Sequence, residues 1–279
     1  MSPYSAFNNS PVLYVDPDGK FSVHNHYIMT FRTLLKLGYD CKTADLLAHY
    51  ASTYADHPTQ EVLTKYNDKG CLYLLQPNRP GINYNKTADS QHEKNSRYHS
   101  MMSDAEYARE ILTYKGSMER GMSFGWDKIL TAATATMDLG DFGQGLHALQ
   151  DAYSHYGRST WQHLGAPYFT DADRGIPDNA QALYMCARDG FPQAFGVQEK
   201  TMNITMSAMI VFDLFRGQSR SLKKALKMGV SQFDFTGMNQ NQLNKVVSKF
   251  KQAGIELDIS YKDHGIDEAE TITAKVKKK

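Results

Sequence analysis

The sequence has little that would cross-link the chain covalently or anchor it in a membrane. Its 279 residues include three cysteines, Cys41, Cys71 and Cys186, which are widely spaced and form no CxxC pair. This argues against a disulfide framework and against a redox or metal-ligand role, and it favours three buried thiols. No segment approaches the roughly 18 uninterrupted apolar residues of a transmembrane helix. The first twenty residues also lack the basic start and apolar core of a signal peptide.

An excess of charge of one sign is missing as well. Lys and Arg number 31 and Asp and Glu 30, which gives a net charge of +1. A dedicated DNA-binding module needs a basic surface, so this balance argues against one, although an enzyme that cuts nucleic acid stays open. The composition is otherwise that of a globular chain, with 41% hydrophobic residues, but it holds as many as 10 histidines.

Apolar residues recur at helical spacing through much of the chain, which predicts a mainly α fold. The segments 59–100 and 158–178 are polar or rich in Pro and Gly, and both are expected to be loops. Thr43 is expected to cap one helix, and Gly140 and Gly143 are expected to separate two others. The predicted helices span residues 24–38, 43–58, 103–112, 125–139, 144–156, 178–189 and 197–216.

The chain changes character near residue 220, where lysines become frequent. One further helix is predicted over 239–254, and the segments 255–263 and 270–279 alternate polar and apolar residues at strand period. We therefore expect three parts. These are a turn-rich linker at 1–20, a multi-helix domain at 21–220, and a small α/β or strand-like C-terminal appendage at 221–279.

The sharpest motif lies in the predicted helix 144–156, where His147, Asp151 and His155 follow one another at intervals of four residues. Each interval raises the helix by roughly 6 Å, so the three side chains share one face, with the histidines some 12 Å apart. That separation is too large for both histidines to bind one zinc ion through bonds of about 2.0–2.1 Å. A polynuclear site with Asp151 as the bridging ligand fits the spacing better.

Such a site needs ligands from several helices, and candidates occur elsewhere in the chain. Imidazole and carboxylate ligands without cysteine suit zinc and leave manganese or iron open. The candidates are His24 or His26, then Asp56, then His92 or His99, and finally His163 with Asp171.

The string LHALQDAYSHYG resembles the signature of the zinc-dependent phospholipase C superfamily, in the branch with an HxLQDxxSH helix. That superfamily includes the HET-C-like proteins and, more distantly, zinc-dependent single-strand nucleases. The likeness covers about residues 21–190. It implies a helical bundle with two or three zinc ions that activate water for phosphodiester hydrolysis.

The resemblance also suggests roles for the other candidates. The segment from residue 24 to Asp56 is similar to the opening of the family, which places His24 or His26 as the first ligand and Asp56 as the second. Asp56 would also orient the attacking water or take its proton, which makes it the catalytic candidate. The third position falls on His92 or His99, and we favour His99.

Downstream, QHLGAPYFTDADRGIPDNAQALYM resembles the H-x7-D segment of the family, which places His163 and Asp171 as further ligands. Two features depart from the phospholipases. His155 follows Asp151 by four residues where those enzymes have six, and the sequence lacks the N-terminal Trp whose amine completes one of their zinc sites.

The first twenty residues, with Asp16-Pro17-Asp18-Gly19, resemble the end of an RHS-repeat core. In RHS proteins a variable C-terminal domain, usually a toxin, follows this motif, and self-cleavage can occur near it. Lys20 stands where those proteins commonly have Leu, so cleavage is left open. The likeness implies a secreted effector that is enclosed by its own RHS core and opposed by a cognate immunity protein.

The sequence therefore predicts a zinc-dependent phosphodiester hydrolase that acts on phospholipid head groups, with peripheral membrane contact. Tyr153, Tyr156 and Trp161, close to the central motif, are the candidate substrate-binding residues. Because aromatic side chains also stack on bases, the same residues would serve a single-strand nuclease. A non-catalytic HET-C-like protein that disrupts membranes, with structural metal, is the third hypothesis.

Overall fold

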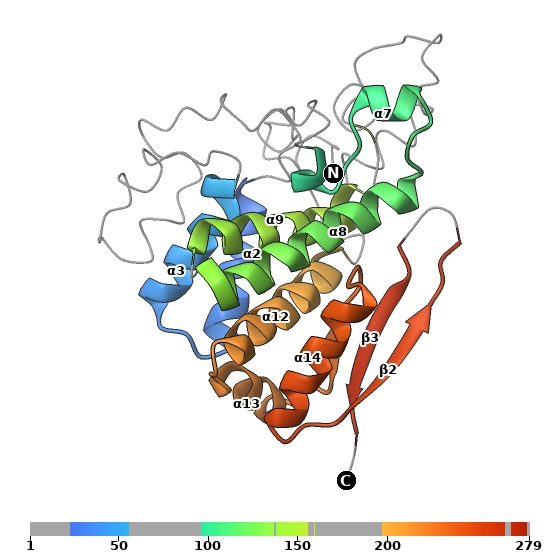
Figure 1. Ribbon diagram of the computed structural model, residues 1–279. Coiled ribbons are helices and arrows are strands. Elements are labelled where there is room, and N and C mark those ends of the chain that lie inside the picture. Colours follow the sequence, from blue (N-terminus) through green and yellow to red (C-terminus); the bar gives the residue numbers. More distant parts are fainter. Residues whose placement is uncertain are drawn as a thin grey trace, which may run out of the picture.

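The structure, a computed structural model, describes residues 23–55, 96–136, 138–155, 159, 197–265 and 269–277 (Figure 1). This part of the chain is mainly helical, with a small three-stranded antiparallel sheet. The expected fold class is confirmed at that level. The predicted linker 1–20 and the predicted helix 178–189 lie outside the described residues.

The described helices follow the chain in this order: α2 (Val23–Lys36), α3 (Cys41–His49), α7 (Asp104–Ala108), α8 (Tyr114–Thr131), α9 (Leu139–His155), α12 (Val197–Phe215), α13 (Arg220–Lys227) and α14 (Gln240–Gln252). Two π-helical turns, η2 (Tyr50–Tyr54) and η4 (Ala132–Thr136), continue α3 and α8. A 3-10 turn, η3 (Arg97–His99), precedes α7. Helices α2, α8, α9 and α12 pack around a common core (Figure 1).

Glycines let α8 and α9 cross at very short range. A Cβ atom on Gly125 would lie 2.7 Å from the Gly145 carbonyl oxygen, and one on Gly145 would lie 2.6 Å from the Gly125 oxygen. Neither position tolerates a side chain, so both residues are glycine for packing and not for flexibility. The sequence prediction was wrong here in two ways. Helix α8 begins at Tyr114 instead of residue 125, and Gly140 and Gly143 lie inside α9 instead of ending a helix.

The first helical hairpin agrees with its prediction at the end of α2 and differs from it at the cap of α3. Helix α2 stops as expected near Gly38, whose φ of 84° requires glycine. Helix α3 is capped by Asp40, whose carboxylate accepts a hydrogen bond from the Thr43 backbone N–H at 2.9 Å, so Thr43 is not the cap. Cys41 is disulfide-bonded, so the prediction of three free thiols is wrong for this residue.

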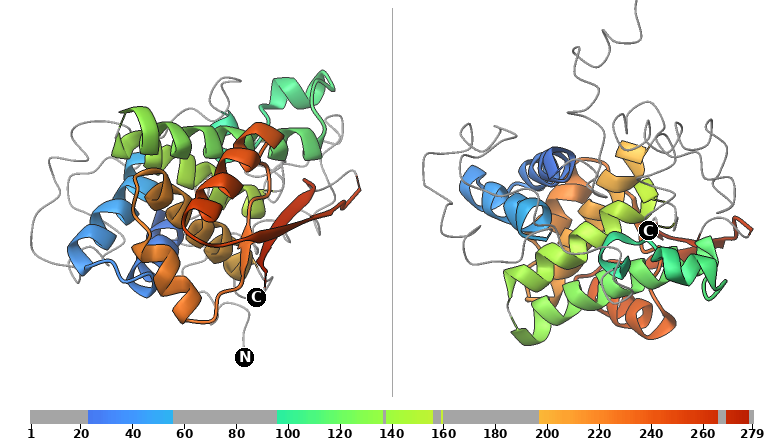
Figure 2. Two further views of the ribbon diagram at one scale, coloured as in Figure 1. Left: turned by 60° about the horizontal axis from the view of Figure 1, so that its bottom comes forward. Right: turned by 90° about the horizontal axis from the view of Figure 1, so that it is seen from above.

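The C-terminal elements form a sheet in the order β1 (Gln232–Asp234), β3 (Thr271–Val276), β2 (Leu257–Lys262), covered by α14 (Figure 2). The predicted helix and both predicted strands are confirmed, whereas the three-residue β1 was not expected. Phe233 pairs with Ala274 in the ladder, and the Phe250 ring lies 5.0 Å from the Phe233 ring.

One continuous core joins this sheet to the helices. The buried Trp126 of α8 lies 6.3 Å, ring to ring, from Phe235 and donates its Nε1–H to the Thr236 carbonyl oxygen at 2.8 Å. The segment after residue 220 is thus packed against the helices through buried aromatic side chains. Within the described residues, no helix combines the length and the apolar character needed to cross a bilayer.

Candidate metal centre

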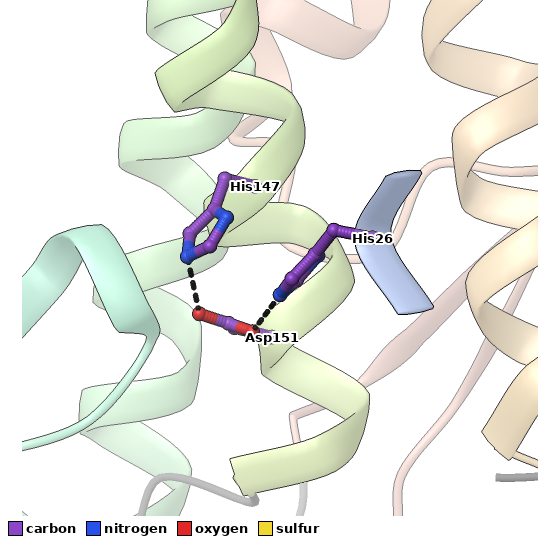
Figure 3. A group of neighbouring side chains, drawn as sticks. All are labelled: His26, His147 and Asp151. Atoms are coloured by element: carbon purple, nitrogen blue, oxygen red, sulfur yellow. Dashed lines mark ion pairs between the residues drawn. The ribbon is translucent and has the colours of Figure 1, made fainter. Parts of the chain in front are cut away.

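Histidines from three separate elements surround the carboxylate of Asp151 in the protein interior. His147 and Asp151 belong to α9, His26 to α2 and His99 to η3, and all four side chains are at most 2% exposed. His26 Nε2 lies 3.0 Å from Asp151 Oδ1, and His147 Nε2 lies 3.0 Å from Oδ2 (Figure 3). One potential ligand atom from each of these three residues lies within 4.8 Å of the other two, so this buried group could hold a metal ion.

His99 is the third histidine beside the carboxylate, and it lies with His147 at Oδ2. Its Nδ1 atom lies 3.2 Å from Asp151 Oδ2 and 3.3 Å from His147 Nε2. Two ligands of a tetrahedral zinc ion are about 3.3 Å apart when each bond measures about 2.0–2.1 Å. The separations among the three atoms are therefore those of ligands that share one ion.

The two oxygens of Asp151 face different histidines. Oδ1 is next to His26, whereas Oδ2 is next to His99 and His147. A carboxylate arranged in this way can bind two ions, one through each oxygen. The donor set of imidazoles and one carboxylate is compatible with zinc.

A backbone carbonyl orients His147. Its Nδ1 donates a hydrogen bond to the Ala51 carbonyl oxygen at 3.1 Å, so its Nε2 presents a lone pair toward Asp151. Ala51 belongs to the π-helical turn η2, which packs against α9. Gly143 makes this contact possible, because a Cβ at that position would lie only 2.3 Å from the Tyr50 carbonyl oxygen.

The segment that carries His99 is fixed to α9 and α8. Ser100 has a left-handed backbone, with φ of 50°, and its hydroxyl donates to the Ala148 carbonyl oxygen at 2.7 Å. Gly121 of α8 lies directly against it, since a Cβ there would be 2.2 Å from Ser100 Oγ. His99 Nε2 is buried and has no hydrogen-bond partner within the described part of the chain. Such an atom fits a site whose remaining contacts come from other residues or from an ion.

A partly buried ion pair supports the same segment from the other side. Arg120 of α8 is paired with Glu106 and also donates to Ser96 Oγ at 2.9 Å and to the Met101 carbonyl oxygen at 3.0 Å. Burial disfavours the Glu106 carboxylate, but Arg120 and the Ser103 N–H outweigh it and lower the pKa of Glu106. The residues on both sides of His99 are thus held by a charged pair.

His155 takes a different position from that of His147. Its Nδ1 donates to the His99 carbonyl oxygen at 2.7 Å and lies 3.8 Å from Asp151 Oδ2. This bond ties the end of α9 to η3 and leaves Nε2 as the atom through which His155 could bind an ion.

The charge of the centre is governed by burial and by the histidines. Burial opposes ionisation of Asp151, but His147, His155 and His26 outweigh it and hold the pKa of the carboxyl well below its usual value. Burial and the neighbouring His147 lower the pKa of His26. Both shifts favour the forms that bind a metal ion, namely the carboxylate of Asp151 and the neutral ring of His26.

The remaining predicted residues are placed only in part. His24 lies in α2, but its side chain is outside what the structure describes, and His26 is the one that faces Asp151. Tyr153 is 6% exposed and donates to Asp234 Oδ2 at 2.5 Å, so it faces the interior. The other candidates, namely Asp56, His92, His163, Asp171, Tyr156 and Trp161, lie outside the described residues.

Sequence reasoning missed the residues that support the ligands. Gln150, Ser100 and Arg120 each bond a ligand histidine or its segment. Only Gln150 carried a usable signal, since it lies within the motif directly before Asp151. No family model matches the sequence, and no curated protein or solved structure matches it either.

Proposed function

We propose that the chain is a zinc-dependent phosphodiester hydrolase with two ions that share Asp151. The observation that carries the proposal is the carboxylate of Asp151, with His26 at one oxygen and His99 and His147 at the other. Shared carboxylates of this kind hold the paired ions of enzymes that displace groups at phosphorus. The alternative is a single ion held by His26, His147 and Asp151, whose ligand atoms lie within 4.8 Å of one another, and the metal count below decides between one ion and two.

The residues of the chain would bind the ions and keep their surroundings dry. Bound zinc would offset the charge of a phosphodiester and lower the pKa of a water molecule toward 7. The Ala51 carbonyl oxygen would orient His147 so that its Nε2 faces Asp151, and the histidines would keep Asp151 ionised. Asp56, the proposed base, directly follows Ala55, a buried residue at the end of the segment that packs on α9.

Phospholipid head groups are the proposed substrate, in line with the likeness of the α9 motif to the phospholipase C superfamily. Two other functions, a single-strand nuclease and a non-catalytic membrane-active protein, are outcomes of the tests below. The RHS-like motif near Asp16-Gly19 supports the further proposal of a secreted toxin domain with an RHS core and an immunity protein as partners.

Metal content of the purified chain tests the centre. We expect about two zinc ions per chain in the wild type, measured by mass spectrometry after desalting. Asp151→Asn should lose both ions, because Asp151 is the ligand that they share. His147→Ala should lose at least the ion at Oδ2, because His147 lies beside that oxygen. His264→Ala is the matched control, since this histidine bonds Thr271 beside β3, away from Asp151. A wild-type chain without transition metal would refute the proposal.

Activity then distinguishes the substrates. The zinc-loaded chain is offered phosphatidylcholine vesicles and single-stranded DNA in parallel, with Asp151→Asn as the inactive reference. Release of phosphocholine without DNA cleavage supports the lipid hydrolase, and the reverse supports the nuclease. Metal-loaded protein that cleaves neither substrate, but makes vesicles leak, would support the non-catalytic alternative.

A further inference from the structure

The side chain of Gln150 links the metal centre to three helices. It is fully buried in α9, next to Asp151. Its Oε1 atom lies 2.7 Å from His26 Nδ1 of α2. Its amide nitrogen donates to Thr30 Oγ1 of α2 at 2.8 Å and to Thr205 Oγ1 of α12 at 2.9 Å. All the groups that can hydrogen-bond on this side chain are therefore in use.

The hydroxyl oxygens of Thr30 and Thr205 accept hydrogen bonds from the Gln150 amide. Both hydrogens of the Gln150 amide are directed at hydroxyl oxygens, so Oε1 is the atom that faces His26. An oxygen acceptor at Nδ1 requires that nitrogen to carry the proton. In neutral His26 the lone pair is then on Nε2, the atom that lies 3.0 Å from Asp151 Oδ1.

Two lone pairs that face one another at this distance repel unless a cation lies between them or one of the atoms carries a proton. Neutral His26 with its proton on Nδ1 offers none at Nε2, so the contact with Asp151 suits a shared cation. The opposite amide orientation would donate to Nδ1 and put the proton on Nε2, next to the carboxylate. For the neutral ring, the orientation of Gln150 thus decides whether His26 is a metal ligand or a hydrogen-bond donor to Asp151.

We propose that Gln150 is a positioning residue that fixes His26 in its metal-binding tautomer, with Thr30 and Thr205 fixing Gln150 in turn. The inference rests on the metal centre of the proposed function and concerns the ion at the Oδ1 side of Asp151. Outer hydrogen bonds of this kind typically change metal affinity by about 10–100-fold.

Two substitutions separate this role from simple packing. Gln150→Met keeps the length of the side chain and removes the acceptor, whereas Gln150→Glu keeps the acceptor and adds a buried charge. If Gln150 only fills space, Met is tolerated and Glu is disruptive, because a buried carboxylate costs more than a buried thioether. If Gln150 positions His26, the order is reversed, since Glu forms a carboxylate–histidine–metal arrangement.

Zinc and cobalt affinities of the full chain are measured by competition with a chromophoric chelator, and the cobalt absorption spectrum reports the ligand geometry. We expect Gln150→Met to lower the metal affinity of one of the two sites by about tenfold or more and to change the cobalt spectrum. Gln150→Glu should be close to wild type in both measurements. Gln242→Met is the control, because Gln242 is also buried and hydrogen-bonded, to Asp127, in the C-terminal part of the chain. Its affinity should be unchanged.

The outcomes are distinct. Wild-type affinity in Gln150→Met, or a larger loss in Gln150→Glu than in Gln150→Met, overturns the inference and leaves the metal centre intact. A wild-type chain that binds neither ion overturns both. If Gln150→Met does not fold, the double variant Thr30→Val and Thr205→Val frees the amide to turn while keeping Gln150. It should lose affinity in the same direction, and wild-type affinity there also overturns the inference.

Discussion

Replacement of Gly143 by alanine tests how tightly α9 must approach η2 for the metal centre to form. A Cβ at this position would lie 2.3 Å from the Tyr50 carbonyl oxygen, 2.5 Å from its carbonyl carbon and 2.9 Å from its Cβ. The nearest atoms are backbone, so the clash cannot be relieved by turning a side chain. The two segments must separate by about 1 Å to restore ordinary contact.

The stability change is the difference between two effects. Forced overpacking costs about 1–3 kcal/mol, and alanine gains about 0.8–1.0 kcal/mol over glycine in a helix. We expect Gly143→Ala to be about 0–2 kcal/mol less stable than wild type, measured by urea denaturation of metal-free protein. The same movement stretches the 3.1 Å bond between His147 Nδ1 and the Ala51 oxygen, so zinc should bind about 10–100-fold more weakly.

Gly116→Ala is the matched control, because this helical glycine also gains a methyl group but meets only side chains. Its Cβ would lie 3.2 Å from Thr113 Oγ1 and 3.8 Å from Leu112 Cδ2. It should be as stable as wild type or up to about 1 kcal/mol more stable, with unchanged zinc affinity. If Gly143→Ala matched this control in both measurements, the close contact between α9 and η2 would not be a requirement of the site.

Four further outcomes are expected. Glu106→Gln should lower the free energy of unfolding by about 2 kcal/mol near neutral pH, measured by urea titration. Because folding lowers the pKa of Glu106, its stabilising effect is present above the unfolded pKa, and the difference between variant and wild type should vanish as the pH falls through the folded pKa. A difference that does not depend on pH would contradict this. Tyr153→Phe should lower the free energy of unfolding by about 1–2 kcal/mol, because the hydrogen bond to Asp234 is lost, and should leave the KM for phospholipid unchanged. A raised KM would support the predicted contact of Tyr153 with substrate. Zinc at about 100 times its Kd should stabilise the wild type by about 2.7 kcal/mol for each bound ion and Asp151→Asn by none, as measured by thermal unfolding with and without chelator. The denatured, unreduced chain should titrate one thiol, since Cys41 is disulfide-bonded, and three thiols would refute the bond.

Local periodicity predicted those elements whose pattern depends only on the chain itself. The strands β2 and β3, the helices α12 and α14 and the end of α2 at Gly38 all follow from it. The glycines of α8 and α9 led to wrong helix boundaries. In the sequence, a glycine that allows another helix to pack closely cannot be distinguished from one that ends a helix. Only the crossing partner, such as Gly145 opposite Gly125, distinguishes the two cases.

The metal centre could also be predicted only as far as local sequence spacing determines it. The spacing of His147 and Asp151 placed them on one helical face without any knowledge of the fold, and the structure has them 3.0 Å apart. The choice between His24 and His26 could not be made from the sequence, because only the tertiary fold decides which of them faces Asp151, and His26 lies 3.0 Å from it. His155 shares the helical face, but its bond to the His99 carbonyl depends on a contact 56 residues away in the sequence.

The order of strands in the small sheet has a consequence for biosynthesis. Strand β3 lies between β1 and β2, and it is the last of the three to be made. At about 5–20 residues per second, β1 waits roughly 2–8 s for the partner that pairs its backbone and closes Phe233 against the core. Until β3 is made, Phe233 and Phe235 lack the strand that pairs with them through Ala274 and Ile272, so we expect these aromatic side chains to stay accessible to a chaperone.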